Sequence, residues 1–187
     1  VVPAINKSTA ADAANLVNST LTIPFADNGY YVLPVSIVSD IFRREGLIEG
    51  SQLQGIPLSM FKTSFGADSV LYITINKWDT NYIVLAANVV VGMSYVLRST
   101  TDSEVLWSYD QEIVVDTSGD STGFILADII KTAITTAMTD YIPIARQVNS
   151  TAVATMPYGK YHPLNNTDAD AKVVLKKSKD KALASSD

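Results

Sequence analysis

Cysteine is absent from this chain of 187 residues, and His162 is its only histidine. The first absence excludes disulfides, thiolate metal sites and cysteine nucleophiles. The second excludes every metal site that needs two imidazoles, and it allows a Ser-His-Asp triad only with His162 as the base. These absences disfavour most hydrolytic chemistry. Because no constellation of acid, base and nucleophile is found either, we predict no catalytic residue, no metal site and no cofactor, and we expect a protein that is not an enzyme.

Basic residues are scarce over most of the chain. Five of the 14 Lys and Arg lie within residues 172–181, but only four of the 19 Asp and Glu lie beyond residue 167, so residues 1–167 carry a net charge of −6. A domain this acidic lacks the positive surface that binds a phosphate backbone, and we expect no nucleic-acid partner. The Lys-rich residues 166–187 predict a disordered tail.

Long apolar runs are also missing. The two most apolar stretches, residues 82–97 and 124–142, are interrupted by polar or charged side chains, so neither can span a bilayer. No signal peptide is present, and the chain opens on an apolar segment at Val1 without a Met. We therefore expect a processed chain whose targeting segment and the beginning of whose first strand lie upstream of residue 1.

The first 35 residues indicate a strand, a helix and a second strand. Val1–Ile5 is the remainder of a strand, and the spacing of Thr9 and Asp12 resembles a capping box at the start of a helix. We expect Pro24 to end this helix. Tyr30–Leu33 lies between a turn signal and a proline, which is typical of a short buried strand.

Two further helices are expected before residue 67. The first ends at Gly46, and the second runs from Pro57, a favoured first helical position, to Gly66. Both glycines supply the positive φ that commonly ends a helix. The core-facing side of the first of these helices is expected to contain Ile37, Val38, Ile41 and Phe42.

From Ser69 onward the apolar period changes from 3.6 to 2. Residues 70–75 predict a strand, residues 77–81 a turn, and residues 83–97 and 105–115 the two strands of a long antiparallel hairpin. Odd-numbered positions of the hairpin are apolar except for Gln111, and even-numbered positions are mostly small or polar. We therefore expect the helices to cover the odd-numbered face, including Val89, Val91, Ile113 and Val115.

These elements follow the order β-α-β-α-α-β-β-β-α. This order predicts an α/β fold in which helices pack on a mixed β-sheet of about five strands. The fold ends in the long hairpin and a C-terminal helix. We predict a single domain over residues 1–165, followed by the tail.

The expected last helix, residues 124–142, has an unusually wide apolar face. Its apolar side chains extend over roughly 180°, whereas a helix on one sheet buries an arc of about 100°. Either the extension around residues 158–163 covers the surplus, or another molecule does. We therefore expect a weak homo-oligomer and a partner interface formed by Ile130, Ile134, Met138, Tyr141, Tyr158 and Tyr161.

Titratable residues do not form a recognisable catalytic pattern. The aspartates are scattered one per turn or helix start, where they accept backbone hydrogen bonds, and no phosphate-binding loop or nucleophile elbow is present. An envelope hydrolase that uses His162 with an acidic partner remains the enzymatic alternative. The Asn-x-Ser/Thr sequons at Asn6, Asn18, Asn149 and Asn165 exceed the number expected by chance too slightly to indicate glycosylation.

Four segments together resemble a known family. They are Asn28–Val35, Phe65–Ile73, the hairpin around Leu97–Trp107 and Met156–Pro163. The chain resembles, over about residues 1–165, a bacterial family of outer-membrane lipoproteins of unknown function, of the neisserial vaccine-antigen lipoprotein type. The resemblance implies a signal peptide and a lipidated cysteine upstream of residue 1. It also implies a fold shared with the periplasmic domains of TolB, CsgG, PelC and LpoB, none of which is an enzyme.

The resemblance and the missing catalytic groups indicate a non-enzymatic domain in the bacterial periplasm, anchored to the outer membrane by an upstream lipid. We expect it to act with other envelope proteins as an accessory or assembly component of an envelope transport or secretion system. A self-assembling ring or pore component is the alternative of another class.

Overall fold

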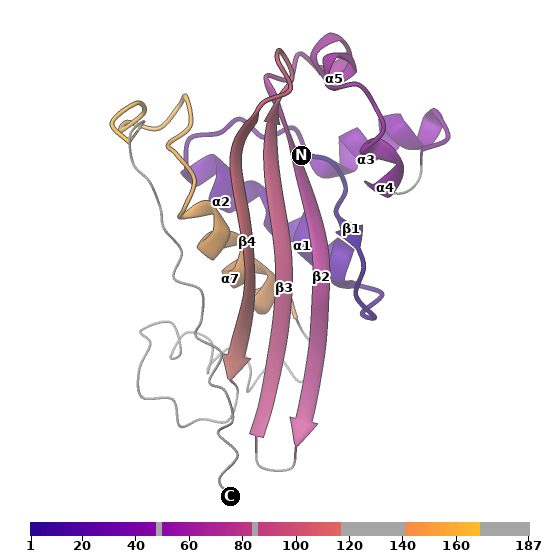
Figure 1. Cartoon of the computed structure of the whole chain (residues 1–187), viewed down its shortest axis with the longest axis vertical. Coiled ribbons are helices and arrows are strands. Elements are labelled where there is room, and N and C mark those ends of the chain that lie inside the picture. Colours follow the sequence, from indigo (N-terminus) through magenta and orange to yellow (C-terminus); the bar gives the residue numbers. More distant parts are fainter. Residues whose placement is uncertain (48–49, 84–85, 117–140, 169–187) are drawn as a thin grey trace, which may run out of the picture.

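A mixed sheet forms one layer of the computed structural model, which describes residues 1–47, 50–83, 86–116 and 141–168 (Figure 1). Its strand order is β1-β2-β3-β4, with β1 parallel to β2 and the other neighbours antiparallel. The predicted α/β class, with helices on a mixed sheet, is confirmed. The strands are β1 (Ile5–Asn6), β2 (Ser69–Ile83), β3 (Ala86–Ser99) and β4 (Val105–Asp116).

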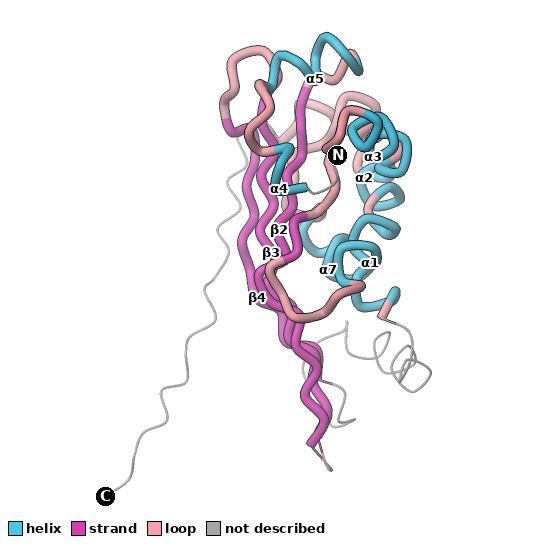
Figure 2. Tube along the Cα trace, turned by 90° about the vertical axis from the view of Figure 1, so that its right-hand side faces the viewer, coloured by secondary structure: helices cyan, strands magenta, loops and turns pink. Residues whose placement is uncertain are grey.

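Helices form the second layer. Figure 2 shows α1, α2, α3 and α7 on one side of the sheet, whereas α4 and α5 lie near the end of β2 at which that strand begins. The C-terminal described helix, α7, packs against α1 and contacts β4. The helices are α1 (Ala13–Thr20), α2 (Thr22–Asp27), α3 (Val35–Arg44), α4 (Gly50–Leu53), α5 (Leu58–Phe65) and α7 (Ile142–Val153).

The main core lies between the sheet and α1, α2 and α7. Val91 is fully buried there and Val89 is buried, as expected, whereas Ile113 is only partly buried. The side chain of Val115 lies outside the described residues. The alternation of β3 therefore predicts the covered face correctly in the middle of the strand.

A buried amide joins three elements of this core. Asn149 of α7 accepts a hydrogen bond from the Tyr95 hydroxyl on β3 (2.7 Å). Its amide group donates to the Val17 carbonyl (3.1 Å) and to Thr20 Oγ1 (2.8 Å) on α1. These bonds satisfy most of the polar capacity of a side chain that has no exposure to solvent. Asn149 is therefore a structural residue, and its sequon is inaccessible in the folded chain.

A second core lies on the opposite face of β2. Val70 and Tyr72 point away from the main core and pack with α3, α4 and α5. Phe42 of α3 lies 5.5 Å from the rings of both Phe61 and Phe65 on α5. As predicted, each helix ends next to a glycine with a positive φ: Gly66 directly follows α5, and Gly46 lies two residues beyond the end of α3.

The segment Tyr30–Leu33 is not a strand, contrary to our expectation. It is an extended connection between α2 and α3 with no partner in the described sheet. Tyr30 and Val32 pack on the main core and Leu33 packs on the second core. The segment is apolar because it bridges two hydrophobic clusters, and a bridge of this kind has the same local pattern as a buried strand.

Pro24 does not end the first helix as predicted. It is the third residue of α2, within the first turn, where a missing N–H breaks no helical hydrogen bond. Leu21, the residue between α1 and α2, itself has helical dihedral angles (φ −75°, ψ −41°). The two helices are therefore nearly continuous.

The predicted turn at residues 77–81 is also wrong, because β2 continues through it. A β-bulge lies at Asn76, since Ile75 pairs with Met93 and Lys77 pairs with Gly92. The extra residue reverses the alternation, so that Trp78 faces the core beyond the bulge although it is even-numbered. A Cβ atom on Gly92 would lie 3.1 Å from that of Lys77, so glycine leaves room for the bulge.

The helix α7 was not predicted. Pro143 is in its first turn rather than at the end of the preceding helix. Most of the expected helix 124–142, including Ile130, Ile134 and Met138, lies outside the described residues.

Candidate functional site

The two most distinctive segments of the sequence dock against each other. The N–H groups of Gly159 and Tyr161 donate to the carbonyls of Asn28 (2.8 Å) and Gly29 (2.9 Å). The Tyr30 hydroxyl donates to the carbonyl of Pro157 (2.8 Å). The C-terminal segment, residues 156–168, is thereby fastened to the turn that follows α2.

Two glycines make this docking possible. Gly29 has a φ of +84°, and a Cβ atom placed on it would lie 2.4 Å from the backbone nitrogen of His162. A Cβ atom on Gly159 would lie 2.4 Å from the carbonyl oxygen of Gly29. Such distances are shorter than any tolerated contact, so the two backbones approach closely only because both positions are glycine.

His162 stabilises the C-terminal segment from within. Its ring stacks on Tyr158 with a centroid separation of 4.0 Å and an interplanar angle of 5°. Its Nδ1 accepts a hydrogen bond from the Leu164 N–H (3.1 Å), and Asp168, which we had assigned to the tail, accepts one from the Tyr158 N–H (2.8 Å). The imidazole is therefore engaged in local structure, an arrangement that gives no support to the hydrolase alternative.

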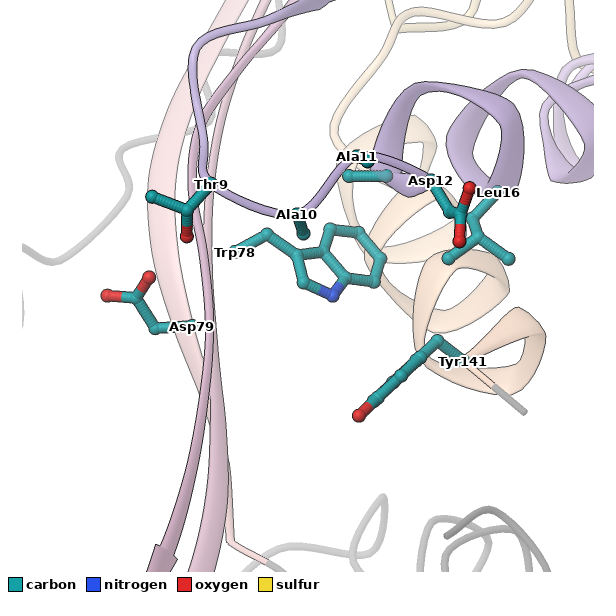
Figure 3. Close-up of a pocket in the computed structure, with 9 residues that line it drawn as sticks. Thr9, Ala10, Ala11, Asp12, Leu16, Trp78, Asp79 and Tyr141 are labelled. Carbon is teal, nitrogen blue, oxygen red and sulfur yellow. The ribbon is translucent and has the colours of Figure 1, made fainter. Parts of the chain in front are cut away.

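A recess of about 420 Å³ lies between the start of α1, the middle of β2 and the start of α7. Figure 3 shows Trp78 at its centre, with Asp12 and Asp79 on opposite sides and Tyr141 below. The rings of Trp78 and Tyr141 meet edge to face, with centroids 6.5 Å apart. The remaining lining residues are Thr9, Ala10, Ala11, Ala13 and Leu16.

Two polar groups of this recess have no partner in the described ranges. Trp78 is only 3% exposed, yet its Nε1–H makes no hydrogen bond within those ranges. Asp12 precedes the first residue of α1, but its carboxylate does not cap the helix, and it makes no ion pair with any described residue. The Asp79 side chain points to the opposite face of β2 (Figure 3), where it lies 4.0 Å from the Lys77 ammonium group. The recess therefore combines an unused donor with one unpaired carboxylate.

The predicted partner interface is not brought together in one place. Tyr141 lines the recess, whereas Tyr158 and Tyr161 lie beyond the other end of α7, a helix about 18 Å long. Tyr158 is partly buried under its contact with His162, but Tyr161 is 68% exposed. Of the predicted interface tyrosines, Tyr161 is the one that the structure leaves open to solvent.

An unexpected apolar surface lies on α3 and the segment before it. Ile37 and Ile41 were predicted to be buried, but they are 56% and 40% exposed. They lie one helical turn apart on the same side of α3, because only Val35, Val38 and Phe42 face the protein. The sequence pattern identified the helix correctly but overestimated the width of its buried face.

Other classes of site find no support in the described part of the chain. No group of three or more His, Cys, Asp or Glu side chains is arranged there to hold a metal ion. None of the helices described has both the length and the apolar character needed to cross a bilayer.

With this geometry established, comparison with known proteins identifies the family. The family model described as Putative lipoprotein GNA1162-like matches residues 1–160. The chain belongs to this family. The match spans three of the four segments that carry the resemblance and the first five residues of the fourth, and it includes both Gly29 and Gly159. A family of lipoproteins implies a location in the bacterial cell envelope.

Individual relatives agree with this assignment. The chain is similar to Putative lipoprotein NMB1124/NMB1162 of Neisseria meningitidis serogroup B, with 27% identity over 142 residues. That match covers 75% of this chain and 66% of the relative, so the chain spans slightly less than two thirds of the relative's length. The crystal structure of lipoprotein GNA1162 from Neisseria meningitidis has 26% identity and a TM-score of 0.59, and the match covers 72% of this chain and 92% of that one.

A more distant solved structure is the PelC dodecamer from Paraburkholderia phytofirmans. It has 16% identity and a TM-score of 0.44, with coverage of 77% of this chain and 84% of that chain. The GNA1162 structure is thus the comparison that supports the fold directly.

Sequence reasoning missed the recess because its parts are distant in the chain. Asp12 and Trp78 are brought together by the parallel pairing of Ile5 with Thr74. A break in the alternation of β2 at Asn76 was the available signal, since a bulge redirects the side chains that follow it.

Proposed function

We propose that this chain is a non-enzymatic lipoprotein domain of the bacterial periplasm, anchored at the outer membrane. In this role it binds other envelope proteins as an accessory or assembly component of a transport or secretion system. The family membership supports the lipoprotein character. The finer role is inferred from how the structure distributes its polar and apolar side chains.

The exposed apolar surface of α3 carries this proposal. Ile37 and Ile41 are well exposed, and Tyr31, in the segment leading to α3, is 78% exposed. Large apolar side chains that gather on one helix of a folded domain typically mark a protein interface. The distinctive His162 is meanwhile engaged in the C-terminal segment. These features support a binding role rather than a chemical one.

Site-specific photo-crosslinking in the envelope tests the proposal. A photoreactive amino acid replaces Ile37 or Ile41 in the lipidated full-length protein. Arg43 provides the control position, because it is exposed on the same helix but points well away from the side that carries Ile37 and Ile41. We expect a discrete adduct with an envelope protein from Ile37 or Ile41 and none from Arg43. Equal adducts from all three positions, or none from any, would contradict the proposed interface.

Weak self-association is a second part of the proposal. Tyr161 and Leu164 are both exposed on the docked C-terminal segment, and this pair supports the predicted contribution of Tyr161 to an interface. Light scattering of the full chain at increasing concentration should show association that Tyr161→Ser reduces. A strictly monomeric wild-type chain would refute self-association without affecting the proposed binding of other proteins.

A further inference from the structure

The recess at Trp78 contains a buried donor that the described chain does not use. The indole of Trp78 is 97% buried, and Figure 3 shows its nitrogen on the ring edge that faces Tyr141 across the recess. Leaving such an N–H without an acceptor costs about 1–3 kcal/mol. Whatever occupies the recess therefore supplies a hydrogen-bond acceptor at this point.

One carboxylate of the recess is free to pair with a positive charge. The Asp12 carboxylate has no ion pair within the described ranges and does not cap α1. Asp79 does not add to it, because Trp78 and Asp79 are neighbours on β2 and their side chains point to opposite faces of the strand (Figure 3). On that other face Asp79 lies 4.0 Å from the Lys77 ammonium group, which also lies 3.6 Å from Glu112. A cationic occupant of the recess would therefore pair with Asp12.

The recess is large enough for an occupant of many atoms. Its volume of about 420 Å³ is far larger than the roughly 30 Å³ that one water molecule takes up. Ala10, Ala11 and Ala13 line one wall, and their short side chains leave this space open. The burial of Trp78 leaves no open ring face on which a sugar could stack. An elongated side chain attached to a backbone fits these constraints.

We propose that this recess binds a peptide segment carrying a lysine or arginine. A backbone carbonyl of the segment accepts the Trp78 Nε1–H, and the cationic side chain pairs with Asp12. This inference deepens the proposed function and rests on it, because it names the chemistry of one partner. The segment belongs to another envelope protein, and the chain's own lysines at residues 172–181, which carry the same charge, are the competing occupant that the experiment distinguishes.

Binding of a defined probe to the full chain tests the recess. The probe is a capped pentapeptide with lysine at its centre and glycine elsewhere, and the matched control has norleucine in place of lysine. We expect saturable changes in tryptophan fluorescence with the lysine peptide alone. Asp12→Asn should weaken binding about fivefold, whereas Asp79→Asn, on the opposite face of β2, and Asp27→Asn, at the far end of α2, should leave it unchanged.

A second arm distinguishes the two sources of the basic segment. The lysines of residues 172–181 are replaced together by glutamine in the full chain. Tighter binding of the probe to this variant identifies the chain's own lysines as a competing occupant. Unchanged binding identifies another protein as the source. Both results support the recess as a site for a basic segment.

Three outcomes would overturn the inference. One is the absence of binding at any probe concentration, which would leave a hydrated recess only. The others are equal binding of the norleucine peptide and undiminished binding to the Asp12→Asn variant. Because the crosslinking experiment probes α3 and this one probes the recess, the proposed function can hold while the inference fails.

Discussion

The two tryptophans of the chain are both buried in the main core, but their surroundings differ. Trp107 on β4 donates its indole N–H to Thr155 Oγ1 (3.2 Å), just beyond the end of α7. Its ring also packs against Tyr95 and Tyr109. Trp78 on β2 has an aromatic neighbour, Tyr141, but no acceptor in the described ranges.

This difference separates structural polar groups from available ones. Around Trp107 and along the C-terminal segment, the polar side chains of Asn149, Thr155 and Tyr30 are all used in internal hydrogen bonds. Around Trp78 a donor and a carboxylate are left over. Buried polar groups in folded proteins normally have partners. The unused groups at the start of α7 are therefore the ones that we propose bind a ligand.

The largest effect is expected at the core position facing Trp78. Val91 pairs directly with Trp78 across β2 and β3 and is fully buried. Val91→Asp should reduce the free energy of unfolding by about 4 kcal/mol, because it buries an unpaired carboxylate. Chemical denaturation measures this loss. An unchanged midpoint would show that the covered face of the sheet has been assigned incorrectly.

The next largest effect concerns the polar junction on the Trp107 side of the core. Asn149→Ala leaves the Tyr95 hydroxyl, the Val17 carbonyl and the Thr20 hydroxyl without their shared partner. We expect a loss of about 3 kcal/mol in the free energy of unfolding. Tyr95→Phe removes only one of these bonds and should cost about 1 kcal/mol. Equal losses for the two variants would argue against a three-way junction.

Adding a single methyl group at Gly29 should detach the C-terminal segment from the turn that follows α2. Gly29→Ala places a Cβ atom against the backbone of His162, and we expect a loss of about 2 kcal/mol together with faster tryptic cleavage after Lys160. Gly46→Ala is the matched control, since Gly46 has a similar φ of +81° but open space around it. That control should cost about 1 kcal/mol without exposing Lys160. Identical cleavage rates in both variants would disprove the close approach.

Thr155→Val should leave the indole N–H of Trp107 without an acceptor, as the N–H of Trp78 already is in the described ranges. The substitution keeps the shape of the side chain but removes the acceptor of the indole N–H. We expect a loss of about 1 kcal/mol, measured by thermal unfolding. A variant as stable as the wild type would mean that the bond to Thr155 contributes nothing, and the contrast between the two tryptophans would lose its basis.

The smallest effect is expected at Asp12. Because this carboxylate has no capping bond and no ion pair in the described ranges, Asp12→Asn should change the free energy of unfolding by less than about 0.5 kcal/mol. Thermal unfolding checks this value. A clear destabilisation would show that Asp12 is a structural residue rather than one available to a ligand.

Much of the fold could be predicted because its signals are local. Gly46 and Gly66 end their helices through their own φ angles, and β3 alternates without interruption over the part that faces α1 and α7. The bulge at Asn76 could not be anticipated in the same way, since it depends on the room left by Gly92 on the neighbouring strand. The apolar alternation of β2 breaks at this bulge, and residues 77–81 were therefore interpreted as a turn.

The candidate sites were harder to predict, for a related reason. A helical period shows which residues share a face, but how much of that face is covered depends on tertiary neighbours, so Ile37 and Ile41 were placed in the core by mistake. Tyr141 was named as an interface residue, and it lines the recess. Its partners Asp12 and Trp78 come from distant segments, and no local pattern connects them.

The most direct test of the contrast uses the two indole N–H resonances of the ¹⁵N-labelled full chain. The lysine pentapeptide is titrated while both resonances are followed, with assignment from a Trp107→Phe variant. We predict that the Trp78 resonance shifts to saturation and that the Trp107 resonance, already bonded to Thr155, stays in place. A Trp78 resonance that does not move, or that moves equally with the norleucine peptide, would contradict a recess kept for a basic ligand.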